Sequence, residues 1–505
     1  MLDRAFIISW GALLRQRGVA AWLVAAATSA AAQAGPPPQD AAVLHRIDAF
    51  VAEQAADSGI PGVAIAVLQD GRASHVRGFG HDGHGNPITG DTPFPIGSLT
   101  KSFTALLVRQ AIDAGQLDAD APVQRYLPWF RVADAQASPR ITLRHLLHQT
   151  SGFSRADGIA PLLQGSHASV GELARGMATT ALNRPVGERF EYSNLNYVLL
   201  GAVLQAVTGK PWDTLMRERV LQPLAMTHSH TDHASARRDG MTALHRMWFG
   251  VPVAHDTPLL PGFAPTGSLV ASAADMARYL QMMLSGGAAP GGRVVSAGAV
   301  TQLLEPASPP SQSTLMSSDF RFRYGEGWFV GPFGAATDAR WHLGNLASFA
   351  AWMVLLPDTK QAVVVLINAN SELPFGEVNA VMSRLPIGVV NLLRGQPAPQ
   401  GPSLRRSYVP FNAAAVLAVA AGVALAWRAG RARLARWSLL LALLAVAAAL
   451  VLRVVGLTAA MLAASVPDLA LVLAVLGSVL CLPALWRAWS WAWHARRHRG
   501  RISQP

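Results

Sequence analysis

The stretch that decides the fold is Pro95-Ile96-Gly97-Ser98-Leu99-Thr100-Lys101, which runs into an apolar segment at residues 102–108. The apolar spacing of that segment predicts a helix. On a helix, Ser98 and Lys101 lie on one face about one turn apart. An amine that burial keeps neutral can take the hydroxyl proton and so generate a nucleophile.

Lysine is rare in this chain, and its rarity gives the Ser-x-x-Lys pattern more weight than chance alone would. The only other lysines are Lys210 and Lys360, and arginine is used everywhere else. Arginine could not act as the base, because the guanidinium does not release its proton. The lysine beside Ser98 therefore favours a chemical role.

Two other short motifs carry groups that hydrolysis can use. Tyr192-Ser193-Asn194 precedes a helix-like run at residues 197–207, and His342-Leu343-Gly344 begins a strand-like run. A tyrosine hydroxyl can pass a proton, an asparagine amide can donate and accept, and a glycine lets a substrate approach the backbone. Taken singly, Tyr192-Ser193-Asn194 also fits an ordinary helix-entry turn, and His342-Leu343-Gly344 carries little information.

Strand-like runs near both ends of residues 40–400, with helix-like runs such as 103–114 and 274–284 between them, predict an α+β fold. We expect one antiparallel sheet built from distant segments and flanked by helices, with a helical insertion. Turn signals at Asp70-Gly71 and at Pro357-Asp358-Thr359 mark two hairpins. The expected hairpins pair residues 63–68 with 74–79 and residues 350–356 with 361–368.

With its three motifs in this order, the sequence resembles the class C β-lactamase and penicillin-binding-protein family of active-site serine hydrolases. That family carries Ser-x-x-Lys, then Tyr-x-Asn, then Lys-Thr-Gly or His-x-Gly. The resemblance covers about residues 42–390. Four further stretches look like the family: Asp91-Thr92-Pro93-Phe94, residues 141–152 (ITLRHLLHQTSG), residues 265–269 (PTGSL) and residues 324–328 (YGEGW).

The resemblance implies a role for each motif residue. Ser98 would be the acylated nucleophile, and Lys101 and Tyr192 would act as a coupled pair that moves protons. Asn194 would orient the substrate amide and Lys101, and His342 would line the carboxylate end of the pocket. Gly344 would let the substrate backbone approach closely. The backbone N–H groups of Ser98 and Asn345 would form the oxyanion hole. No metal or organic cofactor is implied.

The third motif departs from the commoner family pattern, since it has His342 where many relatives have lysine and Leu343 where a small hydroxyl residue is usual. A mostly neutral histidine is a weaker anchor for a substrate carboxylate than an ammonium group. This lowers the expectation of efficient penicillin hydrolysis. Bulkier residues after Gly344, at positions 345–349, are expected to narrow the cleft.

A rival signal is His228-Ser229-His230-Thr231-Asp232-His233, which has the His-x-His-x-Asp-His spacing of metallo-β-lactamases. Histidine and aspartate are suitable zinc ligands. The stretch follows Pro223-Leu224-Ala225-Met226, however, which looks like a turn of the serine family. We therefore expect no metal site.

The ends of the chain predict export and membrane attachment. Residues 1–34 read as a signal peptide, with three arginines, an apolar run at 19–27 and Ala32-Gln33-Ala34; an uncleaved anchor is the alternative. The expected hydrolase domain covers residues 35–394, and a Pro/Gly-rich linker at 395–410 follows it. Three apolar runs within residues 411–490 are expected to be transmembrane helices: 411–427, 437–456 and 469–486. A basic tail follows at 491–505.

Charge supports this topology. Only 14% of the residues are charged, below the ~25% usual in soluble domains, and residues from 401 onward carry +11 of the net +12. Nine arginines flank the expected cytoplasmic ends and three the opposite side, which places the hydrolase domain on the periplasmic face of a bacterial inner membrane.

The first 400 residues lack a basic excess, so nucleic-acid binding is not expected. Buried core helices remain the alternative to the spans.

Three functions are compatible with these features. The first is an exported, membrane-anchored serine hydrolase acting on a small-molecule or peptide ester or amide, as an esterase, D-amino-acid peptidase or β-lactamase-like enzyme. The second is a catalytically silent binding or regulatory module of the cell envelope. The third, a transporter formed by the spans, is disfavoured because they carry no ionisable residue deep in the bilayer.

Overall fold

The computed structural model describes residues 38–257, 260–313, 320–371, 378–431 and 466–479, with a few single positions beyond them. The expected signal peptide, the apolar run at 437–456 and nearly all of the basic tail lie outside the described residues. The chain divides into two units, residues 1–49 and 50–505. The first contains the start of helix α2 (Pro38–Ser58), and the features described below belong to the second.

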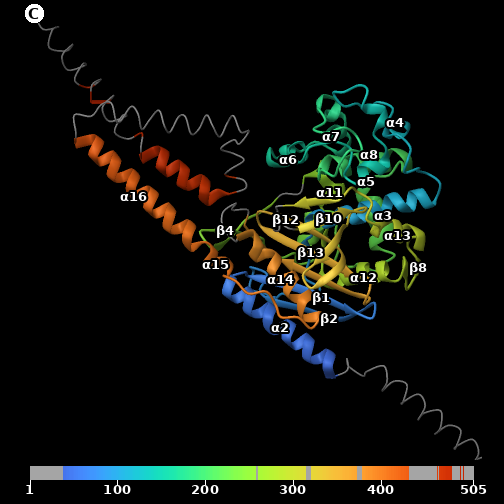
Figure 1. The fold of residues 1–505 in the computed structure, drawn as a ribbon, viewed down its shortest axis with the longest axis horizontal. Coiled ribbons are helices and arrows are strands. Elements are labelled where there is room, and N and C mark those ends of the chain that lie inside the picture. Colours follow the sequence, from blue (N-terminus) through green and yellow to red (C-terminus); the bar gives the residue numbers. More distant parts are fainter. Residues whose placement is uncertain are drawn as a thin grey trace, which may run out of the picture. The chain divides into compact units, whose positions relative to one another are not determined.

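The main sheet is antiparallel and is built from distant parts of the chain (Figure 1). Its strand order is β2-β1-β14-β13-β12-β11-β10-β9, so the first two strands pair with the last ones. The strands are β1 (Gly62–Gln69), β2 (Arg72–Gly80), β9 (Ser311–Ser313), β10 (Phe320–Tyr324), β11 (Phe329–Phe333), β12 (Ala336–Leu346), β13 (Phe349–Leu356) and β14 (Gln361–Ile367). The expected α+β class and antiparallel sheet are confirmed.

Both expected hairpins are present. Strands β1 and β2 are joined at Asp70-Gly71, where φ is +49° and +72°, as a two-residue turn of this hand requires. Strands β13 and β14 are joined at residues 357–360 and pair through the whole length of β14. Strands β1, β14 and β13 are adjacent in the sheet and almost entirely buried, so they contribute much of its buried surface.

Helices pack against the sheet and form the insertion. Helix α12 contacts β1, β2 and β14, and its Tyr279 stacks on Phe103 of α3 with ring centroids 3.8 Å apart. The helices between β2 and β15 are α3 (Thr100–Asp113), α4 (Val123–Tyr126), α5 (Leu143–Leu147), α6 (Arg155–Leu163), α7 (Val170–Gly176), α8 (Asn194–Thr208), α9 (Trp212–Met216), α10 (His233–Arg238), α11 (Ala264–Gly267), α12 (Ala273–Leu284) and α13 (Ala297–Leu304). In Figure 1, α4 to α8 gather as the helical insertion. Helix α8 packs on α3, which brings the second motif toward the first.

Short strands and helical turns complete the described fold. The minor strands are β3 (Phe94–Pro95), β4 (His245–Trp248), β5 (Val251–Ala254), β6 (Val270–Ala271), β7 (Ala288–Ala289), β8 (Gly292–Arg293) and β15 (Ala369–Asn370). The short turns are η1 (Gly97–Leu99), η2 (Ser138–Arg140), η3 (Met177–Thr179), η4 (Arg217–Leu221) and η5 (Pro261–Phe263), and the helices after the sheet are α14 (Val378–Leu393), α15 (Leu404–Ser407) and α16 (Val409–Arg431).

The C-terminal region contains one helical segment long and apolar enough to cross a membrane, among the residues that the structure describes. It covers Leu404–Arg428, with a mean hydropathy of 2.0 and only 11% of its most apolar window buried. It contains the first expected span, residues 411–427. The described part of the third, Pro467–Val479, is a shorter apolar helix. Three spans are therefore not established, and the second and third stay predictions.

Candidate active site

The first motif forms the turn that starts the central helix of the insertion. Ser98 lies in η1, and α3 follows directly. The side chain of Lys101 is completely buried, and its Nζ lies 3.0 Å from Ser98 Oγ and 2.9 Å from the carbonyl oxygen of Thr266. Ser98 itself is half-buried, so its hydroxyl is within reach of both a substrate and the amine.

The surroundings of Lys101 favour the neutral amine. Burial lowers its pKa well below the ordinary value of 10.5, and the positive charge of Arg155 lowers it further. A neutral amine has a lone pair that can accept the hydroxyl proton of Ser98. The Thr266 carbonyl, which belongs to the short helix α11, takes one of its remaining N–H donors and fixes its orientation.

The second motif begins helix α8 and faces the first. Lys101 Nζ lies 5.0 Å from the centroid of the Tyr192 ring. Burial raises the pKa of the Tyr192 hydroxyl, which a hydrogen bond with Ser98 partly opposes, so Tyr192 is protonated at neutral pH. Gln149, whose φ is +59°, supports the motif by accepting a hydrogen bond from the Ser193 N–H at 2.9 Å.

Asn194 is placed differently from the family-based expectation. Its Nδ2 donates to the carbonyl oxygen of Gly158 in α6 at 2.9 Å. Within the described part of the chain, no hydrogen bond joins Asn194 to Lys101, and the partner that orients Lys101 is the Thr266 carbonyl instead. Asn194 remains partly exposed beside Tyr192.

The third motif lies in the second half of β12 and runs past the turn that carries Ser98. A Cβ on Gly344 would lie 2.0 Å from the Ile96 carbonyl oxygen and 2.8 Å from the Ser98 nitrogen, so only glycine fits there. A Cβ on Gly97 would lie 3.2 Å from the Asn345 nitrogen. The backbone nitrogens of Ser98 and Asn345 are thus brought to the same corner of the site.

His342 is buried and held as a neutral ring. Its Nδ1 donates to the Leu343 carbonyl at 2.7 Å, which leaves Nε2 to accept from the Tyr324 hydroxyl at 3.1 Å. Burial lowers the pKa of His342 to about 3. The ring therefore carries no positive charge at neutral pH.

An aromatic wall surrounds His342 and Tyr192. The ring of Phe329 stacks on Trp341 at a centroid distance of 4.4 Å and lies 5.0 Å from His342 and 6.3 Å from Tyr192. Phe190 extends the wall through an edge contact with Phe322. This side of the site is therefore apolar and uncharged, and it suits an apolar group of a substrate.

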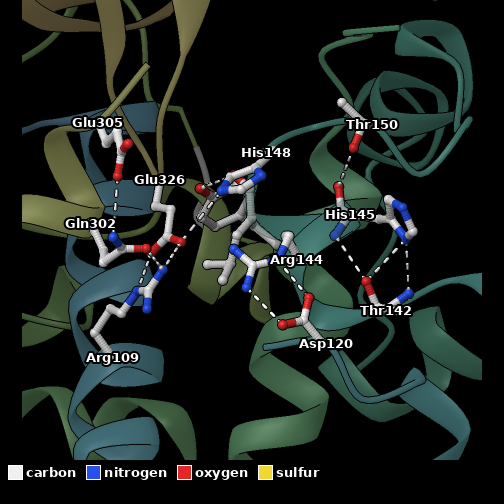
Figure 2. A network of polar contacts seen from close by, with 12 residues as sticks. Arg109, Asp120, Thr142, Arg144, His145, His148, Thr150, Gln302, Glu305 and Glu326 are labelled. Carbon is white, nitrogen blue, oxygen red and sulfur yellow. Dashed lines mark hydrogen bonds and ion pairs between the residues drawn. The ribbon is translucent and has the colours of Figure 1, made fainter. Parts of the chain in front are cut away.

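A buried ionic network joins Glu326 to Arg109 and His148 (Figure 2). Glu326, fully buried in the turn between β10 and β11, accepts two hydrogen bonds from Arg109 of α3, one of them 2.6 Å long from Nε, and contacts His148 Nε2 at 3.4 Å. Burial alone would raise the pKa of Glu326, but hydrogen bonds from His148 and Arg109 outweigh it, and the pKa lies below its ordinary value.

The turn that carries Glu326 touches helix α3 directly beside Lys101. Gly327 has φ of +77°, and a Cβ there would lie 2.6 Å from the Ser102 nitrogen and 2.9 Å from the Lys101 carbonyl carbon. The ionic network therefore ties α3, the turn after α5 and the sheet together at the position of Lys101.

The histidine-rich stretch is divided between separate contacts. His228 Nδ1 and His230 Nε2 both contact Asp239 Oδ2, at 3.0 and 2.8 Å. Asp232 instead caps helix α10 by accepting from the Ser235 N–H. Burial lowers the pKa of His233 to about 4. In the described residues, no three His, Cys, Asp or Glu side chains are grouped as metal ligands.

Three residues at the site had no assigned role in the sequence. Thr266 and Tyr324 lie in stretches that resemble the family, but Thr266 acts through its backbone and Tyr324 through a contact with a distant histidine. Arg155 lies outside all the motifs. Its only sequence signal is a positive charge three residues after the 141–152 stretch.

Comparison with known families agrees with this arrangement. The family described as Beta-lactamase matches residues 47–383, two thirds of the chain, and the chain belongs to this family. The resemblance inferred from the three motifs is confirmed.

Among individual relatives, Penicillin-binding protein 4 of Amycolatopsis lactamdurans is 34% identical over 251 residues, or 47% of this chain and 63% of that protein. Protein flp of Staphylococcus aureus (strain COL) is 25% identical over 330 residues, 65% of this chain and 64% of that protein. The match thus spans less than two thirds of each relative.

Solved structures share the fold. The octameric penicillin-binding protein homologue from Pyrococcus abyssi aligns with a TM-score of 0.60 and 25% identity, over 70% of this chain and 78% of that one. The D-amino acid amidase from Ochrobactrum anthropi SV3 aligns with a TM-score of 0.60 and 21% identity, over 70% and 99%. EstCE1, a hydrolase with promiscuous acyltransferase activity, aligns with a TM-score of 0.59 and 19% identity, over 71% and 100%.

Proposed function

We propose that this protein is an exported, membrane-anchored serine hydrolase that cleaves an ester or amide through an acyl intermediate on Ser98. The observation that carries the proposal is the 3.0 Å contact between Ser98 Oγ and the Nζ of a fully buried Lys101. Among the residues that the structure describes, no carboxylate pairs with this amine, and a structural role suits it poorly because burying an unpaired charge is costly. As a neutral base it is well placed.

In the proposed acylation step, Lys101 takes the Ser98 proton while the hydroxyl oxygen attacks the scissile carbonyl carbon. The N–H groups of Ser98 and Asn345 stabilise the oxyanion. As the tetrahedral intermediate collapses, the proton passes through Lys101 and Tyr192 to the leaving alcohol or amine. Water, activated by the same pair, then hydrolyses the acyl-enzyme.

The remaining motif residues bind and shape the substrate in this proposal. Asn194 offers its amide to the substrate, and Gly344 allows the substrate to lie along β12. His342, neutral and hydrogen-bonded to Tyr324, serves as an uncharged wall. An ester or amide with an apolar group is therefore a better candidate substrate than a penicillin. The carboxylate of a penicillin would be anchored less well by a neutral histidine at the third motif than by an ammonium group.

Membrane attachment belongs to the same proposal. The apolar segment within Leu404–Arg428 supports one span, and its N-terminal end is joined to the folded domain: Leu404 is fully buried, and the hydroxyls of Tyr408 and Ser371 lie 2.5 Å apart. The domain limits proposed are a signal peptide (1–34), a hydrolase domain (35–394), a linker (395–410), a membrane region (411–490) and a cytoplasmic tail (491–505), with the hydrolase outside the bacterial inner membrane.

The test is hydrolysis of 4-nitrophenyl butyrate by the full chain purified in neutral detergent. Ser98→Ala should abolish it and leave the melting temperature nearly unchanged, because a small, half-buried hydroxyl is lost. Ser285→Ala, at an exposed serine after α12, is the matched control and should behave like the wild type. More than a few per cent of wild-type activity in Ser98→Ala would remove Ser98 from the nucleophile role and favour the silent module.

A further inference from the structure

We propose that Arg155 is a specificity-determining residue that selects substrates carrying a carboxylate near the scissile bond; this rests on the proposed function. Arg155 is the first residue of α6 and is exposed. The helix lies directly on the second motif. Gly158 is packed so closely that a Cβ there would lie 2.6 Å from the Asn194 nitrogen and 2.7 Å from Ser193 Oγ.

Two hydrogen bonds fix Arg155 beside Tyr192. Its backbone N–H donates to Glu191 Oε1 at 3.3 Å, and one turn later the Gly158 carbonyl accepts from Asn194. The residues on both sides of Tyr192-Ser193 are thus attached to α6 within one turn of Arg155. The start of this helix therefore has a defined position at the site even though the guanidinium is exposed.

The charge of Arg155 reaches the reacting groups. Burial has the larger effect on each group, lowering the pKa of Lys101 and raising that of Tyr192, and the charge of Arg155 acts to lower both pKa values. The nearby carboxylates are engaged elsewhere: Glu191 contacts Asn183 Nδ2 at 2.8 and 3.0 Å, and Asp157 accepts from Ser154. Within the described residues, no carboxylate pairs with the Arg155 guanidinium.

The basic residues of the three motifs are held toward their neutral forms, and Arg184, the other arginine beside the second motif, contacts Glu191 at 3.9 Å. His342 stays uncharged because it is buried, and the burial of Lys101 favours its neutral form. The aromatic wall around Phe329 adds no charge. A negative group on the substrate therefore finds its counter-charge at Arg155, beside Tyr192, and not at the third motif on β12. A guanidinium can bind a carboxylate through two parallel hydrogen bonds.

The experiment compares charged and neutral substrates on the full chain in neutral detergent. In the first pair, one carboxyl group of adipic acid forms a 4-nitrophenyl ester, and the other is either a free carboxylate or a carboxamide. A second pair places the charge on the leaving group: 4-acetoxybenzoate and 4-acetoxybenzamide. The variants are Arg155→Gln, Arg155→Lys and a control, Arg217→Gln, at a half-exposed arginine beyond α9.

The quantity measured is the ratio of kcat/KM for the charged substrate to that for its neutral partner. We expect Arg155→Gln to lower this ratio about fivefold in at least one pair, the scale of an exposed ion pair. Arg155→Lys should retain most of it, and Arg217→Gln should leave it unchanged. Raising NaCl to 0.5 M should lower the ratio in the wild type but not in Arg155→Gln, because salt screens exposed charges.

A ratio that Arg155→Gln leaves unchanged in both pairs overturns this inference. If the neutral esters are still hydrolysed by the wild type and not by Ser98→Ala, the proposed function stands and only the role of Arg155 is wrong. If the wild type hydrolyses none of the four substrates, the proposed function and this inference both fail.

Discussion

Replacing Lys101 separates the proposed chemistry from a structural role. Lys101→Met removes the amine but keeps an unbranched side chain of similar length. Two hydrogen bonds are lost, to Ser98 Oγ and to the Thr266 carbonyl, each worth about 1 kcal/mol net, and the buried Thr266 carbonyl loses its donor at about 1–3 kcal/mol. Removing a buried amine that costs free energy to desolvate offsets part of this loss.

We therefore expect Lys101→Met to lose about 1–3 kcal/mol of unfolding free energy and still fold, since domains are stable by about 5–15 kcal/mol. Its kcat/KM should fall at least ~100-fold, the scale of general-base catalysis. Lys101→Arg keeps a positive charge but cannot supply a neutral base, so it should lose activity to a similar extent, with a further cost of about 1–3 kcal/mol for overpacking a fully buried site.

The assay is hydrolysis of 4-nitrophenyl butyrate from pH 5 to 9, with the melting temperature and the amount of membrane-bound protein measured for each variant. Lys210→Met is the matched control, because Lys210 is half-exposed and pairs with Glu218 away from the motifs. It should retain wild-type activity. If Lys101→Met or Lys101→Arg stays within tenfold of the wild type and keeps the same acidic limb, the Ser-Lys mechanism is refuted.

Three other substitutions or fusions test separate parts of the account. Glu326→Gln should lower the unfolding free energy by about 3 kcal/mol at pH 7, because it breaks a buried ion pair. Since the pKa of Glu326 is lowered in the folded protein, the wild type should lose this advantage as the pH falls below about 4.5. Equal stability of the two proteins at pH 7 in thermal unfolding would contradict the network. Gly344→Ala should lower kcat/KM at least ~10-fold by pushing β12 away from Ser98, whereas Gly171→Ala, with open space around it, should have little effect; equal kinetics in the two variants would remove the close approach. A reporter that fluoresces only in the cytoplasm should be bright when fused after Arg436 and dark after Ser403, and the reverse pattern would overturn the topology.

The parts of the fold that the sequence predicts are those with local signals. Asp70-Gly71 has the turn chemistry of a two-residue hairpin, and α3, α8 and α12 have helical apolar spacing, so their bounds are close to the expected ones. Strands β9 to β11 were not expected, because two of them are short and their partners are set by the sheet and not by a local pattern.

The sequence motifs indicate which side chains gather at the candidate site, but they carry no signal for contacts made by the backbone or by distant residues. Ser98, Lys101 and Tyr192 are brought together as their motif order implies. The Thr266 carbonyl could not be foreseen, because any residue has a backbone oxygen. The pairing of Arg109 with Glu326 joins residues 217 positions apart and leaves no periodic signal. The packing of Gly158 on Asn194, which places the start of α6 beside the second motif, also leaves no signal in the sequence.

The most direct test of the central claim is the covalent modification of Ser98. The full chain is incubated with a fluorophosphonate, or separately with a penicillin, then digested with trypsin and analysed by mass spectrometry. The peptide from Gly78 to Lys101 contains Ser98 as its only serine. The account predicts a fluorophosphonate adduct on this peptide in the wild type and none in Ser98→Ala, while the penicillin reaction reports substrate range. An unmodified wild-type peptide, or an adduct that persists at another residue in Ser98→Ala, would contradict a Ser98 nucleophile.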